Sequence, residues 1–381
     1  MASSSTPTPT TPPTRVQDLW FPDGDVVVRA GNTLFRVHAP VLERRAPALR
    51  GLLAVSQADP DSEEVDGAPV LVLQDPPEQV THWLRAMFIA DSFPAPPQPT
   101  TLDALDAVLR LSHKYDTTHL RTRGMQHLAT LFATDVPSLS SLHCTLTDAD
   151  DTPAFLARTY ALARDVRADW ALPHALYDLH TTIWADAGAL EHLAPPAPTA
   201  LGTAGHGLGP ADYTFGPADY ARLFRAARAV VDWWPAEDLL LCQDRDLNRD
   251  LNRCARRQTC ADMQRGYLSA YMDEWRTDPL RFFWEGGAGD KGCAGEEGTA
   301  GMEGEAGMEG IAGMEGTARM EEEEGGAGQE YVRLLCEPCA AVVRSRHEAH
   351  SIAFWQAFPA ALNLAGWDML WGLKRRDTNA D

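Results

Sequence analysis

The first thing this sequence lacks is a long hydrophobic run. No segment of the 381 residues approaches the ~20 consecutive apolar residues that a membrane-spanning helix requires. The N-terminus also lacks the charged start and apolar core of a secretory signal, and the chain contains only seven cysteines. We therefore expect an intracellular protein, in the cytoplasm or the nucleus, whose thiols are reduced.

Positive charge is also scarce. The 54 acidic side chains outnumber the 33 of lysine and arginine, which gives a formal net charge of −21. A surface that binds nucleic-acid phosphates needs a basic stripe, so the composition predicts no nucleic acid as a partner, and no membrane. One arginine cluster is interleaved with aspartates, which favours a solvated helix face. Its members are Arg249, Arg253, Arg256 and Arg257, with Asp244, Asp246 and Asp250.

The sequence signatures of common catalytic sites are missing as well. There is no Walker A sequence, no Gly-x-Ser-x-Gly and no His-Glu-x-x-His. The spacing Gly287-x-Gly289-x-x-Gly292 follows no predicted strand and lies among acidic residues that would repel a pyrophosphate. We therefore predict that the protein is not an enzyme. We expect no catalytic residues, no cofactor-binding residues, no cofactor and no small-molecule substrate.

What the N-terminal part does contain is a strand–turn–strand pattern followed by helices. Residues 26–28 and 34–37 form two short extended runs, and the Gly31-Asn32 pair between them favours a hairpin. Two short helices are expected over 40–45 and 47–53, because each starts with a proline, whose missing N–H is not needed in a first turn. Further along, 70–73 is a continuous apolar run typical of a buried strand. Apolar residues then recur at helical spacing over 80–88, 105–115 and 120–132.

This order closely resembles the start of a BTB/POZ domain, of the type expanded in fungi. The family pattern is an Asp, a hydrophobic strand, a turn with Gly, then Phe, His, a Val-Leu helix and a closing hydrophobic pair. The matching residues are Asp25, Gly31, Phe35, His38, Val41, Leu42, Leu49, Leu52 and Leu53. Residues 109–116 resemble the paired terminal helices of the same fold. The resemblance implies an α+β fold over 16–133, with a small sheet flanked by helices.

The resemblance also implies a function. We expect a non-enzymatic protein–protein interaction module that binds another protein or itself as a homodimer. The alternative is a substrate adaptor of a cullin-type ubiquitin ligase, although no kelch, MATH or ankyrin repeat accompanies the domain. Ala39 stands where many dimeric members carry Arg or Lys after the family His. Asp25 and His38 remain, and we interpret them as a polar pair that fixes the hairpin against its helix; a partner-binding pocket is the other interpretation.

Beyond residue 133 the apolar spacing is helical, which we attribute to core packing in a second, all-helical domain. A low-complexity acidic segment interrupts this domain. It repeats a Gly-Met-Glu-Gly hexapeptide pattern and cannot bury enough apolar surface to offset the entropy of ordering it, so it is predicted to be disordered. The predicted organisation is a disordered lead at 1–15, the BTB-like domain at 16–133, the helical domain in two parts at 134–284 and 329–381, and the disordered insertion at 285–328.

The cysteines allow two interpretations. Cys336-x-x-Cys339 has a spacing that can chelate Zn²⁺, but it needs two further ligands. His347 and His350 lie on the same helical face, yet at ~1.5 Å per residue the four would span about 21 Å, so they cannot bind one ion together. The further ligands would have to come from the upstream cysteines Cys242, Cys254 and Cys260.

The other interpretation is that these cysteines are buried and act as small hydrophobic side chains, which is common for free thiols. From the sequence alone we favour this interpretation and assign no metal-binding residue. If zinc is bound, the expected set is Cys254, Cys260, Cys336 and Cys339.

Overall fold

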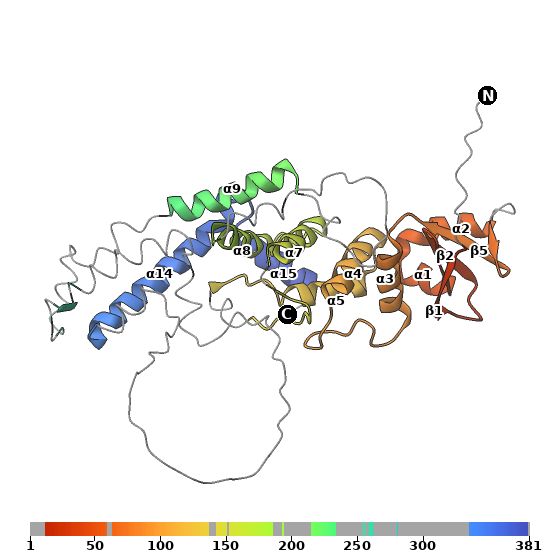
Figure 1. Ribbon diagram of the computed structural model, residues 1–381, viewed down its shortest axis with the longest axis horizontal. Helices are drawn as coiled ribbons and strands as arrows, with labels where there is room; N and C mark the ends of the chain where they lie inside the picture. Colours follow the sequence, from red (N-terminus) through yellow and green to blue (C-terminus); the bar gives the residue numbers. More distant parts are fainter. Residues whose placement is uncertain are drawn as a thin grey trace, which may run out of the picture. The chain divides into compact units, whose positions relative to one another are not determined.

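The computed structural model in Figure 1 describes most of the chain. The described residues are 12–58, 63–136, 142–150, 152–185, 193, 215–233, 254, 256, 259, 260, 262, 280 and 335–379. The chain forms two compact units, one made of Met1–Ala229 with Phe354–Asp381 and one made of Val230–Ala353. None of the described helices is both long enough and apolar enough to cross a membrane.

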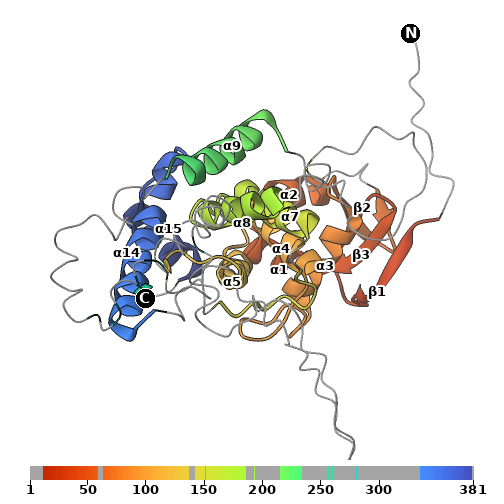
Figure 2. The same cartoon turned by 60° about the vertical axis from the view of Figure 1, so that its left-hand side comes forward.

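A five-stranded sheet lies in the first unit, which confirms the expected α+β class. Its strands are β1 (Thr14–Trp20), β2 (Val26–Ala30), β3 (Thr33–Val37), β4 (Glu64–Val65) and β5 (Ala68–Leu73). Their order is β1-β3-β2-β5-β4, and Figure 2 shows β1, β3 and β2 as neighbours. Strand β2 is antiparallel to β3 and parallel to β5, while β1 is parallel to β3.

The structure confirms the predicted hairpin and the position of its turn. Val26 pairs with Val37 and Ala30 with Thr33, so the chain reverses at Gly31-Asn32. Gly31 has φ +54°, a conformation that residues with a side chain rarely adopt. A Cβ at this position would also approach the side chain of Pro77 to 3.3 Å. The turn therefore favours glycine here, and any side chain at this position would also crowd Pro77.

Strand β1 corrects the expected extent of the N-terminal lead. The sequence predicted a disordered lead through residue 15, but the strand begins at Thr14. Only Leu19 of this strand is fully buried, so its hydrophobic alternation is too weak to recognise in the sequence. Contacts from outside the strand hold it instead, since Arg85 donates two hydrogen bonds to Asp18, at 2.7 and 3.2 Å. The two-residue strand β4 was not expected from the sequence either.

Helices follow the strands, and the two expected at 40–45 and 47–53 are present, but the second begins as a 3-10 turn and continues to Ala58. The helices are α1 (Ala39–Arg45), a short 3-10 helix η1 (Pro47–Leu49), α2 (Arg50–Ala58) and α3 (Pro77–Phe88). Then follow α4 (Leu102–Tyr115) and α5 (Thr118–Leu128). Thr101 caps α4 by accepting a hydrogen bond from the backbone N–H of Ala104, at 3.3 Å. Many apolar side chains of these strands and helices are fully buried: Val26, Val28, Phe35, Val37, Leu42, Leu49, Leu53, Val80, Trp83 and Leu84. Val27 forms a cluster with Leu34, Ala68 and Val70.

The remaining described helices are α7 (Pro153–Asp165), α8 (Leu172–Ala185), α9 (Pro217–Asp232), α14 (Glu337–Ala361) and α15 (Trp367–Thr378). The last part of α14 and all of α15 belong to the first unit. There the indole N–H of Trp371 donates to the carbonyl of Thr134 at 3.1 Å, and Gln126 on α5 donates to the carbonyl of Thr378 at 2.9 Å. The C-terminal helix is thus attached directly to α5, so the first unit continues past residue 133.

Several expectations concern residues outside the described part of the chain. These residues include the first eleven, the acidic insertion at 285–328 and most of the arginine cluster, of which only Arg256 is described. Cys242 also lies outside the described residues.

Candidate functional site

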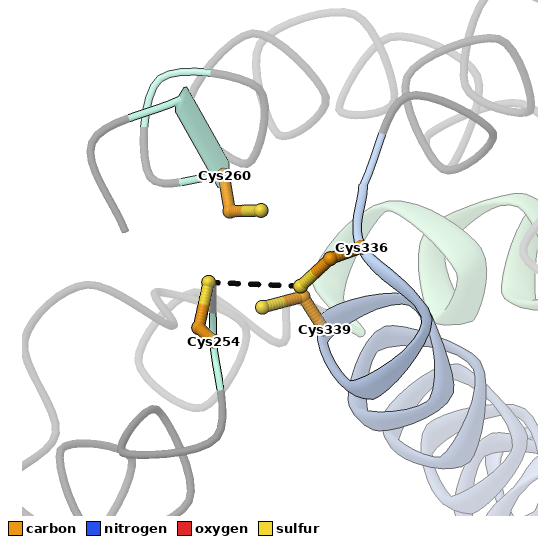
Figure 3. Close-up of side chains that lie close together, drawn as sticks. All are labelled: Cys254, Cys260, Cys336 and Cys339. Carbon is orange, nitrogen blue, oxygen red and sulfur yellow. Dashed lines mark hydrogen bonds between the residues drawn. The ribbon is translucent and has the colours of Figure 1, made fainter. Parts of the chain in front are cut away.

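Four cysteines from distant parts of the sequence meet in the second unit. They are Cys254, Cys260, Cys336 and Cys339, and their sulfur atoms all lie within 4.8 Å of one another. Figure 3 shows the four side chains directed toward a common point. Cys254, Cys260 and Cys339 are buried, and Cys336 is partly exposed. The arrangement has the composition of a four-thiolate metal centre.

Local structure places each pair of sulfurs. Cys336 directly precedes α14, and Cys339 lies in its first turn, where a spacing of three residues puts both side chains on one side of the helix. The backbone N–H of Cys339 donates to the carbonyl of Cys336 at 2.9 Å. In the other segment the N–H of Cys260 donates to the carbonyl of Arg256 at 2.9 Å, which forms one helical turn. A backbone hydrogen bond therefore fixes Cys336 and Cys339 relative to each other, and a helical turn from Arg256 fixes the backbone at Cys260.

Cys260, Cys336 and Cys339 differ in how easily their thiols ionise. Burial raises the pKa of Cys260 and Cys339, with contributions from the neighbouring thiols. Burial also acts on Cys336, but hydrogen bonds from the backbone of Cys339 and from the other thiols outweigh it and lower the pKa of Cys336 to about 7. Cys336 lies at the N-terminus of α14, where the helix dipole favours negative charge. One thiolate is thus accessible near neutral pH before any cation binds.

The structure brings together one of the sets considered from the sequence. The Cys336–Cys339 pair meets Cys254 and Cys260, as the zinc interpretation required. His347 and His350 do not belong to this group of ligand atoms. His347 is fully buried farther along α14, where burial and the nearby His350 lower its pKa to about 3. The Cys-x-x-Cys spacing pointed to half of the cluster, whereas the five residues between Cys254 and Cys260 follow no standard spacing.

The Asp25–His38 pair does not form as expected. The carboxylate of Asp25 accepts a hydrogen bond from the backbone N–H of Ala39 at 2.6 Å, in the first turn of α1. His38 instead lies 3.8 Å from the carboxylate of Asp23 and stacks against Phe21, with ring centroids 5.4 Å apart. Asp25 therefore does fix the hairpin against its helix, but through the backbone rather than through the imidazole.

A cavity of about 430 Å³ opens beside the end of α3. Its polar lining comes from Arg45, Asp91, His119 and Arg123. Arg45 donates to the carbonyl of Met87 at 2.5 Å, and Arg123 donates to the carbonyl of Phe93 at 2.7 Å. Each guanidinium therefore uses one of its five N–H donors on a backbone carbonyl.

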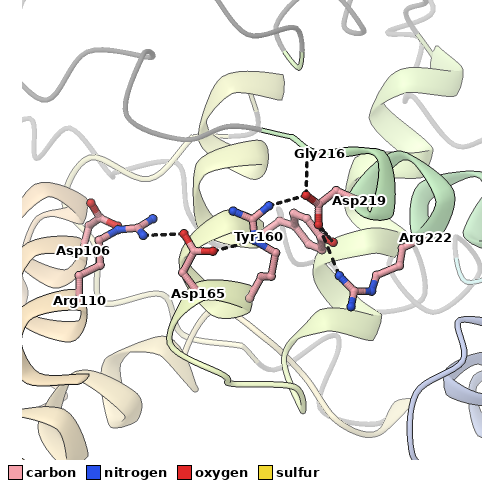
Figure 4. Close-up of polar contacts among 8 residues, drawn as sticks. Asp106, Arg110, Tyr160, Asp165, Gly216, Asp219 and Arg222 are labelled. Carbon is pink, nitrogen blue, oxygen red and sulfur yellow. Dashed lines mark hydrogen bonds and ion pairs between the residues drawn. The ribbon is translucent and has the colours of Figure 1, made fainter. Parts of the chain in front are cut away.

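A network of charged residues links three helices of the first unit, as Figure 4 shows. Its centre is the buried carboxylate of Asp219, in the first turn of α9. This carboxylate accepts hydrogen bonds from the hydroxyl of Tyr160 at 2.9 Å and the N–H of Gly216 at 2.9 Å, and it pairs with Arg164. The network extends through Asp165, which bridges Arg164 on α7 and Arg110 on α4. Every charge is paired, which is the arrangement of a structural network.

One hydroxyl–imidazole pair resembles part of a hydrolase site. The Thr145 hydroxyl lies 2.8 Å from Nδ1 of His127. Nε2 of the same ring lies 2.8 Å from the carbonyl of Pro94, which assigns the ring proton to Nε2 and makes Nδ1 the acceptor. Both side chains are buried, and the ring of Phe93 packs against His127. The pair therefore joins two loops to α5 and is closed to a substrate.

The fold and the cysteine cluster define a mixed α+β protein with a candidate four-thiolate centre in its second unit. Comparison with known proteins adds no relative: no protein-family model, no curated protein and no solved structure matches the chain.

Proposed function

We propose that residues 16–133 form a BTB/POZ domain and that the protein is a non-enzymatic protein–protein interaction module. The observation that carries the proposal is the position of the pattern residues in the fold. Phe35, Leu42, Leu49 and Leu53 are fully buried, and Gly31 occupies the hairpin turn with a positive φ. The burial of these residues and the turn at Gly31 support the proposal.

Helix α2 offers a surface for such a partner. Leu52 is 51% exposed and Val55 is 67% exposed, although Leu53 beside them is fully buried. Leu52 and Val55 are three residues apart, so they lie next to each other on the outer face of the helix. Exposed, adjacent apolar side chains lose unfavourable contact with water when a second protein covers them. We assign this α2 surface, defined by Leu52 and Val55, to the interaction, with a second copy of the chain as its simplest partner.

The experiment compares the full chain with a variant of this surface. Sedimentation velocity over a range of concentrations measures self-association of the wild type and of the double variant Leu52→Glu/Val55→Glu. We expect the wild type to dimerise and the variant to dimerise at least tenfold more weakly, because two charges would be buried in the interface. Phe224→Glu is the matched control, since Phe224 is 74% exposed on α9 and should leave association unchanged.

A second arm titrates the full chain with the purified N-terminal domain of a cullin. Binding in this arm would support the adaptor alternative in place of self-association. A chain that stays monomeric at high concentration and does not bind the cullin domain would contradict the proposal that this domain is an interaction module.

A further inference from the structure

We propose that Cys254, Cys260, Cys336 and Cys339 bind one structural zinc ion that joins the start of α14 to the 254–262 segment. This inference concerns the second unit and goes beyond the proposed interaction function. It rests on three features of the cluster: the spacing of the sulfurs, their chemistry and their surroundings.

The sulfur spacing fits a tetrahedral ion. Zinc binds thiolates at ~2.3 Å in a tetrahedron, which places neighbouring sulfurs about 3.8 Å apart. The sulfurs of Cys254 and Cys336 are 3.6 Å apart, and none of the four is more than 4.8 Å from another. A disulfide needs ~2.05 Å between its sulfurs, so this pair is not bonded. Movements of about an ångström or less would bring all four to the ideal spacing.

The ligand set selects the metal and its role. Four thiolates in a tetrahedron suit zinc or iron, and zinc binds such sites more tightly than ferrous iron does. Four protein ligands leave no open position for water or substrate, which makes the site structural rather than catalytic. The acid and amide oxygens that calcium or magnesium prefers are absent from this set. Each thiol would release its proton to solvent as it binds the metal.

The surroundings favour negative sulfur at this position. Cys336 and Cys339 lie at the N-terminus of α14, where free backbone N–H groups and the helix dipole stabilise thiolates. Three of the four ligands are buried, so little water competes for the ion. Buried cysteines that served only as small hydrophobic groups would not need their sulfurs to converge on one point, as they do in Figure 3.

The zinc cross-link would also hold together the two ends of the segment that separates the ligand pairs. The ligand pairs are separated in sequence by 261–335, which includes the Gly/Glu repeat. Joining both ends of a long segment costs entropy that grows only slowly with its length. A zinc ion at its ends would fix the two ends together whatever the length or composition of the intervening segment.

The test begins with the wild-type chain, purified under reducing conditions without chelator. Mass spectrometry of the metal should find about one zinc ion per chain and no iron. Replacing zinc with cobalt should produce the visible absorption of tetrahedral cobalt thiolate. Removing the metal with a chelator should lower Tm by about 10 °C or more, and adding zinc should restore it.

Variants locate the site. Cys336→Ser should lose most of the bound zinc, whereas Cys144→Ser, at a cysteine outside the cluster, should retain it. The wild-type measurements do not depend on whether Cys336→Ser folds. Three results would each overturn the proposal: a wild-type chain with less than a tenth of an equivalent of zinc and no cobalt spectrum, iron in place of zinc, or a disulfide among these four cysteines.

Discussion

Different kinds of contact stabilise the inside of each of the two units. In the first unit, large aromatic side chains form a continuous buried group, in which Tyr177 meets Trp355 and Phe358 edge-on and Trp367 stacks on Trp355 at 5.2 Å. In the described part of the second unit, the buried apolar side chains are smaller, and the sulfurs of four cysteines meet at one point. The first unit therefore depends on extensive apolar burial, whereas the second, on the zinc proposal, depends on a local metal cross-link.

The two units should therefore respond differently to substitutions and to metal removal. Stability that comes from a large packed core is lost in proportion to the volume removed. Stability that comes from a metal cross-link is lost when any one ligand or the ion is removed. The variants below test these two behaviours, beginning with the largest expected effect.

Trp355→Ala should lower the free energy of unfolding of the first unit by about 3–5 kcal/mol. Trp355 is fully buried against His174, Tyr177 and Trp367, so the change leaves a large cavity. Urea unfolding followed by tryptophan fluorescence and circular dichroism measures the loss. Trp184→Ala is the matched control, because Trp184 is 52% exposed and its removal should cost less than about 1 kcal/mol. Equal losses in both variants would contradict a packed aromatic core.

Asp219→Ala should lower the same free energy by about 3 kcal/mol. The change leaves Arg164 and the Tyr160 hydroxyl without their buried acceptor, which costs more than the loss of an exposed ion pair. Arg222→Ala is the control, since Arg222 meets Asp219 only at 3.4 Å and is partly exposed. Its loss should stay below about 1 kcal/mol. If the control variant destabilised the chain as much as Asp219→Ala, the network would not centre on Asp219.

Two buried histidines, one in each unit, should make the chain sensitive to acid. Burial lowers the pKa of His180 to about 4, and burial with His350 nearby lowers the pKa of His347 to about 3. A group whose pKa is lower in the folded chain stabilises the fold above its ordinary pKa of 6.5 and loses that contribution as pH falls toward the folded value. Between pH 7 and pH 5 each histidine should therefore cost about 2 kcal/mol.

The measurement is the unfolding free energy at both pH values for the wild type, His180→Leu and His347→Leu. Each variant should lose about 2 kcal/mol less than the wild type on acidification. A wild-type stability that does not change between pH 7 and pH 5 would show that neither ring is kept neutral by burial.

Much of the first unit could be predicted from its sequence, because hydrophobic spacing and turn residues act locally. The Gly31 turn and the run at 70–73 identified three strands, and the prolines identified the helices between them. Strand β1 could not be found in this way, since only Leu19 is fully buried. Its pairing with β3 and the bonds from Arg85 to Asp18 depend on residues elsewhere in the sequence. Asp25 was expected to fix the hairpin against its helix, and it does so, but its carboxylate accepts from the backbone N–H of Ala39 and not from His38.

The cysteine cluster was only half visible in the sequence. The Cys336–Cys339 spacing is a local signal, because three residues along a helix bring two sulfurs to one face. Nothing local selects Cys254 and Cys260 as the second pair, since their approach to α14 depends on the folding of the whole unit. The Asp219 network also depends on long-range folding. Its members come from three separate helices and share no spacing that sequence analysis could recognise.

Hydrogen exchange of the full chain, measured by mass spectrometry with and without a zinc chelator, tests the contrast between the units most directly. The account predicts that chelation removes protection from the backbone amides at 340–353 in α14, while those of α4 and α7 exchange as before. Added zinc should restore the lost protection. Exchange that is unchanged throughout, or that increases equally in α4 and in 340–353, would contradict a metal-dependent second unit beside an independently packed first one.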